Sequence, residues 1–174
     1  MTADVAADGE RTSKDAMASI SGQLVVLSTG EHALLRRMYL TEKPAADGAV
    51  VKLLLHAGIA AHVYERDYSA WRLLAHVSAL LSGTGRARVH DGRRGLGAAL
   101  HDAGLSESRL LRLTAARGPA LVDQIVRAAR MLAQADEAPI NLWTLLHLAG
   151  REPQKAEAAR IRVAQDYYSA AARA

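Results

Sequence analysis

Two adjacent arginines, Arg36 and Arg37, are the first residues along the chain whose type points to a specific chemistry. The guanidinium group is flat, permanently charged and shaped to hold a phosphate or a carboxylate with two hydrogen bonds. On the helix predicted here, neighbouring side chains diverge by about 100°. At most one of the pair can therefore face the core, and there only in a salt bridge. We predict that one of the two is functional.

A second group of arginines lies between residues 105 and 131, where five arginines stand against two acidic residues, Glu107 and Asp123. Positive charge therefore remains even if both acids are paired. Arg109 and Arg112 are three residues apart and share one face of their predicted helix. Because phosphate matches the guanidinium geometry, we predict that this group binds nucleic acid. Its members are Arg109, Arg112, Arg117, Arg127 and Arg130.

Arg127 and Arg130 differ in their surroundings. Asp123 lies four residues before Arg127, so the two can form an intrahelical ion pair that stabilises the helix by about a few tenths of a kcal/mol. Such a pair accounts for an arginine at position 127 equally well as phosphate binding does. Arg130 has no comparable acid upstream on its stripe and is the better candidate. A solvated helix face could show the same surplus of charge, so the role of Arg127 stays open.

The segment over residues 83–95 is rich in glycine and arginine. Four glycines separate its arginines, and Asp91 is the one acid among them. This composition predicts a mobile basic loop, whose arginines are further candidates for contacts with nucleic acid. They are Arg86, Arg88, Arg93 and Arg94.

Aromatic side chains could stack on bases, as they do in many proteins that bind single strands. The chain has no phenylalanine, and its tryptophans and most of its tyrosines fall on apolar helical stripes or at helix ends. We expect them to pack in the core, so that binding is electrostatic and tolerant of sequence. The residues concerned are Trp71, Trp143, Tyr64, Tyr68, Tyr167 and Tyr168.

Other chemistries lack the residues that they need. The seven histidines show neither the HxxxH nor the HExxH spacing that would place two metal ligands on one helical face. The absence of cysteine excludes a thiolate zinc site and a cysteine nucleophile. The glycines around Gly95 fail the GxGxxG pattern at Leu100, and no GxSxG motif occurs. We predict no metal, no cofactor and no enzymatic activity.

Length and composition indicate one domain or two small lobes with a real core, since half of the 174 residues are apolar. The formal net charge is +4, but residues 1–20 carry −2, so the remainder has +6. Together with a pI near 9.7, this surplus favours a polyanionic partner. The first residues lack the positive region of a secretory signal, and no stretch of about 18 apolar residues occurs, so we predict a cytoplasmic protein.

Hydrophobic periodicity predicts an all-α protein of about eight helices. Residues 1–20 alternate small and charged types without periodicity and predict a flexible tail. Residues 24–27 could form a strand, but a single strand would have no partner. We predict an N-terminal helical lobe over 21–94, ending in the basic loop, and a C-terminal helical lobe over 95–174. The helices are expected at about 23–38, interrupted at 28–30, and at 50–63, 68–81, 96–103, 106–115, 119–134, 141–150 and 153–174.

The order of several motifs is similar to that of a known family. Leu27–Arg37 reads LSTGEHALLRR, with leucine, glycine, alanine and paired arginines in turn. Gly95–Leu100 reads GLGAAL, and Ser106–Leu113 follows as a helix that begins polar and carries two arginines. This ordered series resembles the CasB family, the small subunit of the type I-E CRISPR Cascade complex. Further similar segments are Arg130–Leu132, Asn141–Leu148 and Arg160–Tyr168.

The resemblance implies a two-lobed, all-helical subunit without enzymatic activity, present in two copies in the complex. Its basic surface would stabilise the hybrid of crRNA with its target and the displaced DNA strand. By position, Arg37, Arg109 and Arg130 match basic residues of that surface. The implied partners are crRNA, the target and displaced DNA strands, the other Cascade subunits and a second copy of the chain, with no membrane. Residues 23–26 and Leu148 stand where the family often has tryptophan, which leaves the contacts of the first lobe less defined.

Two other functions fit the same residues. A DNA-binding regulator of the helix-turn-helix type could use residues 106–115 and 119–134 as its two helices, joined by a short turn with a glycine. Against it, the second helix opens Pro-Ala-Leu-Val, which offers little to read a base edge. A purely structural helical adaptor could instead use the arginines to bind acidic protein surfaces.

Overall fold

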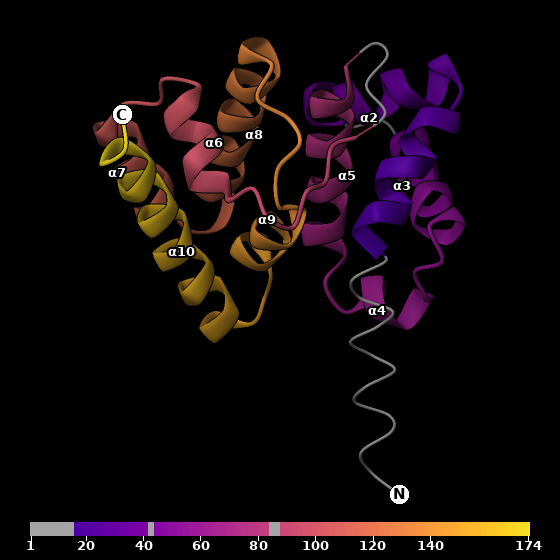
Figure 1. Cartoon of the computed structure of the whole chain (residues 1–174). Helices are drawn as coiled ribbons and strands as arrows, with labels where there is room; N and C mark the ends of the chain where they lie inside the picture. Colours follow the sequence, from indigo (N-terminus) through magenta and orange to yellow (C-terminus); the bar gives the residue numbers. More distant parts are fainter. Residues whose placement is uncertain (1–15, 42–43, 84–87) are drawn as a thin grey trace, which may run out of the picture.

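The computed structural model of the chain is built from helices, as the sequence predicts (Figure 1). The structure describes residues 16–41, 44–83 and 88–174. Within these ranges ten helices occur, and the β pairing is an isolated bridge between His90 and Ile140. The first helix spans residues 16–26. It is followed by α2 (Thr29–Thr41), α3 (Pro44–His56), α4 (Ala61–Glu65), α5 (Tyr68–Ser82), α6 (Leu96–Asp102), α7 (Glu107–Ala115), α8 (Gly118–Ala135), α9 (Leu142–Ala149) and α10 (Pro153–Ala171).

The N-terminal part holds more helix than the sequence predicts. Residues 16–20 are helical, and Met17 and Ile20 are fully buried, so the last part of the predicted tail belongs to the core. Residues 1–15 lie outside the described ranges. α3 begins at Pro44, where a break is expected, because proline fits the first turn of a helix, where its missing N–H is not needed.

The predicted helix over residues 50–63 is divided in two. α3 ends at His56, and Gly58 takes a φ of 76°, a left-handed conformation that stops a helix and favours glycine. The chain then turns into the short helix α4. This division accounts for one of the helices beyond the predicted eight.

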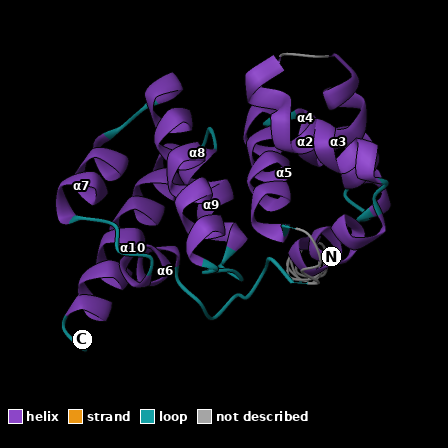
Figure 2. Ribbon diagram, turned by 90° about the horizontal axis from the view of Figure 1, so that it is seen from above, coloured by secondary structure: helices purple, strands orange, loops and turns teal. Residues whose placement is uncertain are grey.

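α5 is the central element of the fold. Eleven of its 15 residues are buried, among them Trp71, Leu74 and Val77. It packs against α2 and α3 on one side and against α8 and α9 on the other (Figures 1 and 2). Because one continuous cluster of buried side chains joins both sides, α5 fixes the position of the N-terminal helices relative to α8. The division into two lobes at residues 94 and 95 stays a prediction.

α6 and α10 cross at a distance that only glycine allows. A Cβ atom on Gly97 would overlap the carbonyl oxygen of Val163 in α10 and lie 2.7 Å from the backbone nitrogen of Tyr167. The Tyr167 hydroxyl donates a hydrogen bond of 2.6 Å to the carbonyl oxygen of Leu105, which fixes α10 against the turn after α6. α10 therefore positions α6 and the start of α7.

No helix in the described ranges combines the length and the apolar composition that crossing a membrane requires.

Replacing Gly97 by alanine tests the close crossing of α6 and α10. The added methyl group meets backbone atoms that cannot move aside, so Gly97→Ala should lower the free energy of unfolding by about 3 kcal/mol. Gly48→Ala is the matched control, because a Cβ atom on Gly48 in α3 meets nothing within 4 Å. That change should raise stability by about 0.5–1 kcal/mol. Urea denaturation measures both, and equal effects of the two substitutions would contradict the crossing.

Candidate nucleic-acid interface

α7 presents its arginines to solvent because its leucines face the core. Leu110 and Leu113 are buried, whereas Arg109 and Arg112 lie on the opposite, exposed face. This is the arrangement that their spacing predicts. The next helix, α8, buries Ile125 and leaves its own arginines exposed.

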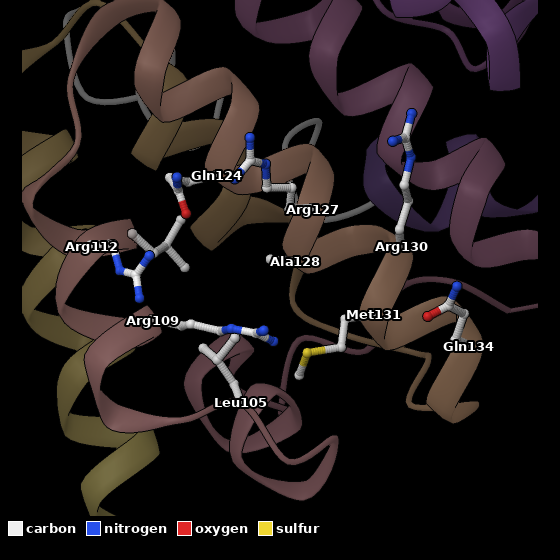
Figure 3. A pocket seen from close by; sticks show the side chains of 10 residues that line it. Leu105, Arg109, Arg112, Gln124, Arg127, Ala128, Arg130, Met131 and Gln134 are labelled. Carbon is white, nitrogen blue, oxygen red and sulfur yellow. The ribbon is translucent and has the colours of Figure 1, made fainter.

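A groove of about 420 Å³ runs between α7 and α8, and we call it the arginine groove (Figure 3). Four of the predicted site residues, two from each helix, line it, and no acidic side chain does. Figure 3 shows their guanidinium groups spread along the groove from α7 to α8. Its lining consists of Leu105, Arg109, Arg112, Leu113, Gln124, Arg127, Ala128, Arg130, Met131 and Gln134.

The charges of the arginine groove are not neutralised by the described part of the chain. None of its four arginines makes an ion pair there; Arg112 only donates through Nε to the carbonyl oxygen of Ser108 at 3.3 Å. The alternative of an intrahelical pair is wrong, because Asp123 and Arg127 form no ion pair in the structure. Asp123 lines a different groove, at the start of α8. Four uncompensated positive charges in one depression produce a strong positive potential.

Arg130 lies at the end of the arginine groove that faces α5. In Figure 3 its side chain extends from α8 toward α5, away from Arg109. A titratable group affected by its charge in α5 is His76. This side chain is fully buried, and its Nδ1 lies 2.7 Å from the carbonyl oxygen of Leu35. Burial lowers the pKa of His76, and the positive charges of Arg130 and Arg72 lower it further. The positive potential of the arginine groove therefore extends to α5.

The paired arginines of α2 lie outside the arginine groove. Leu35 and Met38 take the buried positions of α2, and both Arg36 and Arg37 are exposed. Neither side chain faces the core. Burial lowers the pKa of the nearby His32, and the charge of Arg36 lowers it further.

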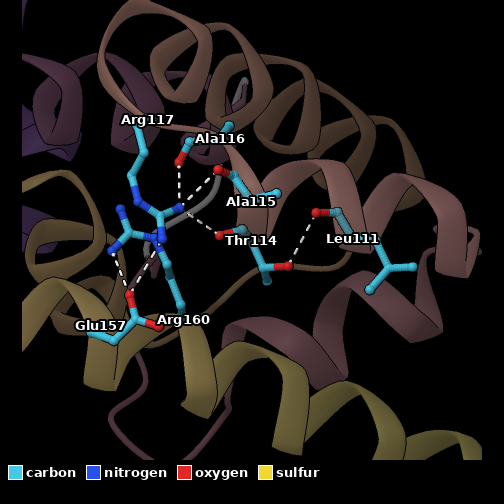
Figure 4. Close-up of polar contacts among 7 residues, drawn as sticks. All are labelled: Leu111, Thr114, Ala115, Ala116, Arg117, Glu157 and Arg160. Atoms are coloured by element: carbon cyan, nitrogen blue, oxygen red, sulfur yellow. Dashed lines mark hydrogen bonds and ion pairs between the residues drawn. The ribbon is translucent and has the colours of Figure 1, made fainter.

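Arg117 has partners within the chain. Its Nη1 donates to the carbonyl oxygens of Thr114, Ala115 and Ala116 at 2.8–2.9 Å, where α7 ends (Figure 4). A cation near these unpaired carbonyl groups stabilises the helix C-terminus. The sequence does not reveal this role, because the carbonyl acceptors belong to the backbone.

The described part of the predicted basic loop, residues 88–95, contacts the rest of the fold, and its predicted mobility stays a prediction. Val89 is buried, and its carbonyl oxygen accepts from the backbone nitrogen of Ile140 at 3.1 Å. Arg94 forms ion pairs with Glu137 and Asp102. Arg88 and Arg93 are exposed, and Arg86 lies outside the described residues.

Most of the aromatic side chains pack inside the molecule. Trp71, Tyr64 and Tyr167 are buried, and Trp143 and Tyr68 are half-buried. The prediction is wrong for Tyr168, which is 43% exposed and donates to Glu107 at 2.8 Å. None of the aromatic residues lines the arginine groove, so this groove has no platform for stacked bases.

Two residues of the arginine groove were not predicted from the sequence. Gln124, near Arg127, and Gln134, near Met131, line it and can donate to phosphate oxygens (Figure 3). Their signal is positional: residues 124, 127, 131 and 134 recur at helical spacing on one face of α8. Among the described residues, no three histidine or carboxylate side chains gather as metal ligands.

Comparison with known protein families gives one match. The sequence profile of the family described as CRISPR-associated protein Cse2 matches residues 31–168, from the first turn of α2 to the last turn of α10. No curated protein and no solved structure matches the chain.

Arg94 and Arg93 allow a structural arginine to be compared with an exposed neighbour. Arg94→Ala should lower the free energy of unfolding by about 2 kcal/mol, because Glu137 loses its charged partner and the contact between residues 88–95 and 137–141 weakens. Arg93→Ala should change it by less than about 0.5 kcal/mol. Thermal and urea denaturation measure both values. A smaller effect for Arg94→Ala than for Arg93→Ala would contradict the ion-pair assignment.

The buried and half-buried histidines predict that the protein loses stability as the pH is lowered. The pKa values of His32, His76, His90 and His147 lie below the ordinary 6.5, chiefly because burial disfavours the charged ring. The unfolded chain therefore binds protons that the folded chain does not, and stability is lost as pH falls below about 6.5. Urea midpoints at about pH 7.5 and 5.5 test this expectation. Stability that is unchanged or higher at the lower pH would contradict it.

Proposed function

Since the chain belongs to the Cse2 family, the small subunit of the type I-E CRISPR Cascade complex, we propose that its arginine groove binds the sugar–phosphate backbone of nucleic acid within that complex. The observation that carries the proposal is the set of four arginines on two helices, gathered in one groove without an acidic residue. Arginine suits this task because its guanidinium group binds phosphate oxygens bidentately and keeps its charge at every physiological pH.

In this function the chain is a non-catalytic subunit that stabilises the crRNA–target hybrid and the displaced DNA strand. Guide pairing reads the sequence, and exchange of the DNA duplex for the RNA–DNA hybrid is nearly balanced in free energy. A few protein contacts to the nucleic-acid backbone can therefore shift this exchange toward the R-loop, in which the hybrid has formed and one DNA strand is displaced. The absence of aromatic residues from the arginine groove supports binding that is tolerant of sequence.

The helix-turn-helix alternative receives no support from the exposed surface of α8. The first turn exposes Gly118, Pro119 and Ala120, which carry no side-chain hydrogen-bond donor or acceptor. Asp123, exposed on the next turn, would repel phosphate. Direct readout of a major groove needs donors and acceptors at this position.

The test uses whole Cascade that contains Arg109→Gln and Arg127→Gln together. Each glutamine removes a positive charge and keeps a polar, though shorter, side chain. R-loop formation on target DNA, measured over a series of salt concentrations, should weaken. The slope of log affinity against log salt should fall by roughly 1.4–1.8, since each lost phosphate contact contributes about 0.7–0.9.

Arg173→Gln is the matched control, because it removes one exposed arginine at the C-terminus, outside the arginine groove. It should leave both the affinity and the salt slope unchanged. If the double variant lowers the yield of assembled complex, but the complex that does form retains DNA normally, the adaptor function is correct instead. If the purified chain alone protects one specific duplex sequence from cleavage, it is a regulator.

A further inference from the structure

A second groove lies at the other end of α8 from the arginine groove. It has a volume of about 790 Å³ and is bordered by the start of α8, the end of α9 and the start of α10. We call it the α8–α10 groove. Its floor and walls are largely apolar, with Leu121, Val122, Leu148 and Pro153 among the lining residues. Three guanidinium groups, from Arg117, Arg151 and Arg160, and two carboxylates, from Asp123 and Glu157, complete the lining.

Arg160 is the unusual residue of the α8–α10 groove, because it is charged and only 8% exposed. Its Nη1 donates to Oε2 of Glu157 at 3.3 Å. Its Nε is buried and has no hydrogen-bond partner. A buried N–H of a charged group without an acceptor is unfavourable, so the site holds donor capacity that the fold leaves unused.

Arg117 shares the same acceptor. Its Nη2 lies 3.4 Å from Oε2 of Glu157, so one carboxylate oxygen serves two guanidinium groups (Figure 4). The hydrogen bonds of Arg117 Nη1 to the end of α7 hold this guanidinium in position. The cluster thus has two positive charges and one negative charge, in an arrangement fixed before any ligand arrives.

The two helices that begin here favour a negative group as well. α8 and α10 have 18 and 19 residues, and neither has a side-chain hydrogen bond at its N-cap. Unpaired backbone N–H groups and the positive end of the helix dipole attract a carboxylate or a phosphate.

We propose that the α8–α10 groove receives an acidic side chain, flanked by apolar residues, from another protein subunit of the complex. The carboxylate supplies the negative charge that Arg117 and Arg160 lack, and the apolar lining covers the neighbouring side chains of the partner. A protein segment fits better than nucleic acid, because a hydrated phosphodiester backbone would leave Leu121, Val122 and Leu148 without apolar contacts. This inference does not depend on what binds in the arginine groove.

The experiment measures binding of the purified chain to Cascade assembled from the other subunits and guide RNA but without this chain. Arg160→Gln should weaken binding by at least about tenfold, because it removes one partner of a desolvated charge pair. Arg162→Gln is the control on the same helix: this side chain is 69% exposed, and binding should stay within about twofold of the unmodified chain. Thermal denaturation of each free variant verifies that it folds.

Glu157→Gln keeps the test valid if Arg160→Gln does not fold, since the Glu157 side chain is 57% exposed. This change removes the internal competitor for the two arginines, so binding should be at least as tight as for the unmodified chain. Binding that weakens with Glu157→Gln would overturn the proposal, because the cluster would then serve the chain's own structure.

Two further outcomes would also overturn it. One is equal binding by folded Arg160→Gln and Arg162→Gln variants. The other is normal assembly with Arg160→Gln but weaker retention of target DNA, which would assign the α8–α10 groove to nucleic acid. The arginine-groove variant Arg109→Gln/Arg127→Gln should assemble normally, so failure of this inference and failure of the proposed function can be told apart.

Discussion

The arrangement of this protein depends on the burial of α5. A helix with eleven of 15 residues buried must be covered on nearly all sides, and here α2 and α3 cover one side while α8 and α9 cover the other. This constraint sets the position of α8 against the N-terminal helices. It also brings Arg130 close enough to His76 for its charge to oppose protonation of the ring. The core therefore determines where the positive charges of α8 can act.

The desolvation of arginine then separates these residues by role. A guanidinium group cannot lose its charge, so an arginine with low exposure needs acceptors inside the fold. Arg94 finds them at Glu137 and Asp102, and Arg160, which is 8% exposed, finds one at Glu157. The arginines of the groove between α7 and α8 have no acidic neighbour there and remain available to a polyanion. Position relative to acidic residues, more than the number of arginines, distinguishes structure from binding.

Local patterns predict much of this molecule, and long-range contacts limit the rest. From α5 onward, helix positions follow from periodicity within a few residues. The spacing of Arg109, Arg112, Arg127 and Arg130 is enough to place them on exposed faces. Two of the ion pairs join residues far apart in the sequence: Glu137 lies 43 residues from Arg94, and Glu157 lies 40 residues from Arg117, so no local pattern reveals these two contacts. Burial of the helix over residues 16–26 likewise depends on tertiary packing, including the hydrogen bond from the Val89 backbone to Ser21.

The two proposed binding surfaces lie at different ends of α8 and would serve complementary tasks, one on a nucleic-acid backbone and the other on a neighbouring subunit. Four arginines supply a weak and salt-dependent attraction, which competes with every other phosphate in the cell. Such an attraction becomes selective when the subunit is held beside the strand that it should bind. Attachment to a complex raises the effective concentration of the binding surface at that strand, to the order of millimolar for short linkers. A separate protein-binding surface is therefore the physical complement of an unspecific electrostatic one. Residues of α8 line both grooves, so this helix sets the distance between them.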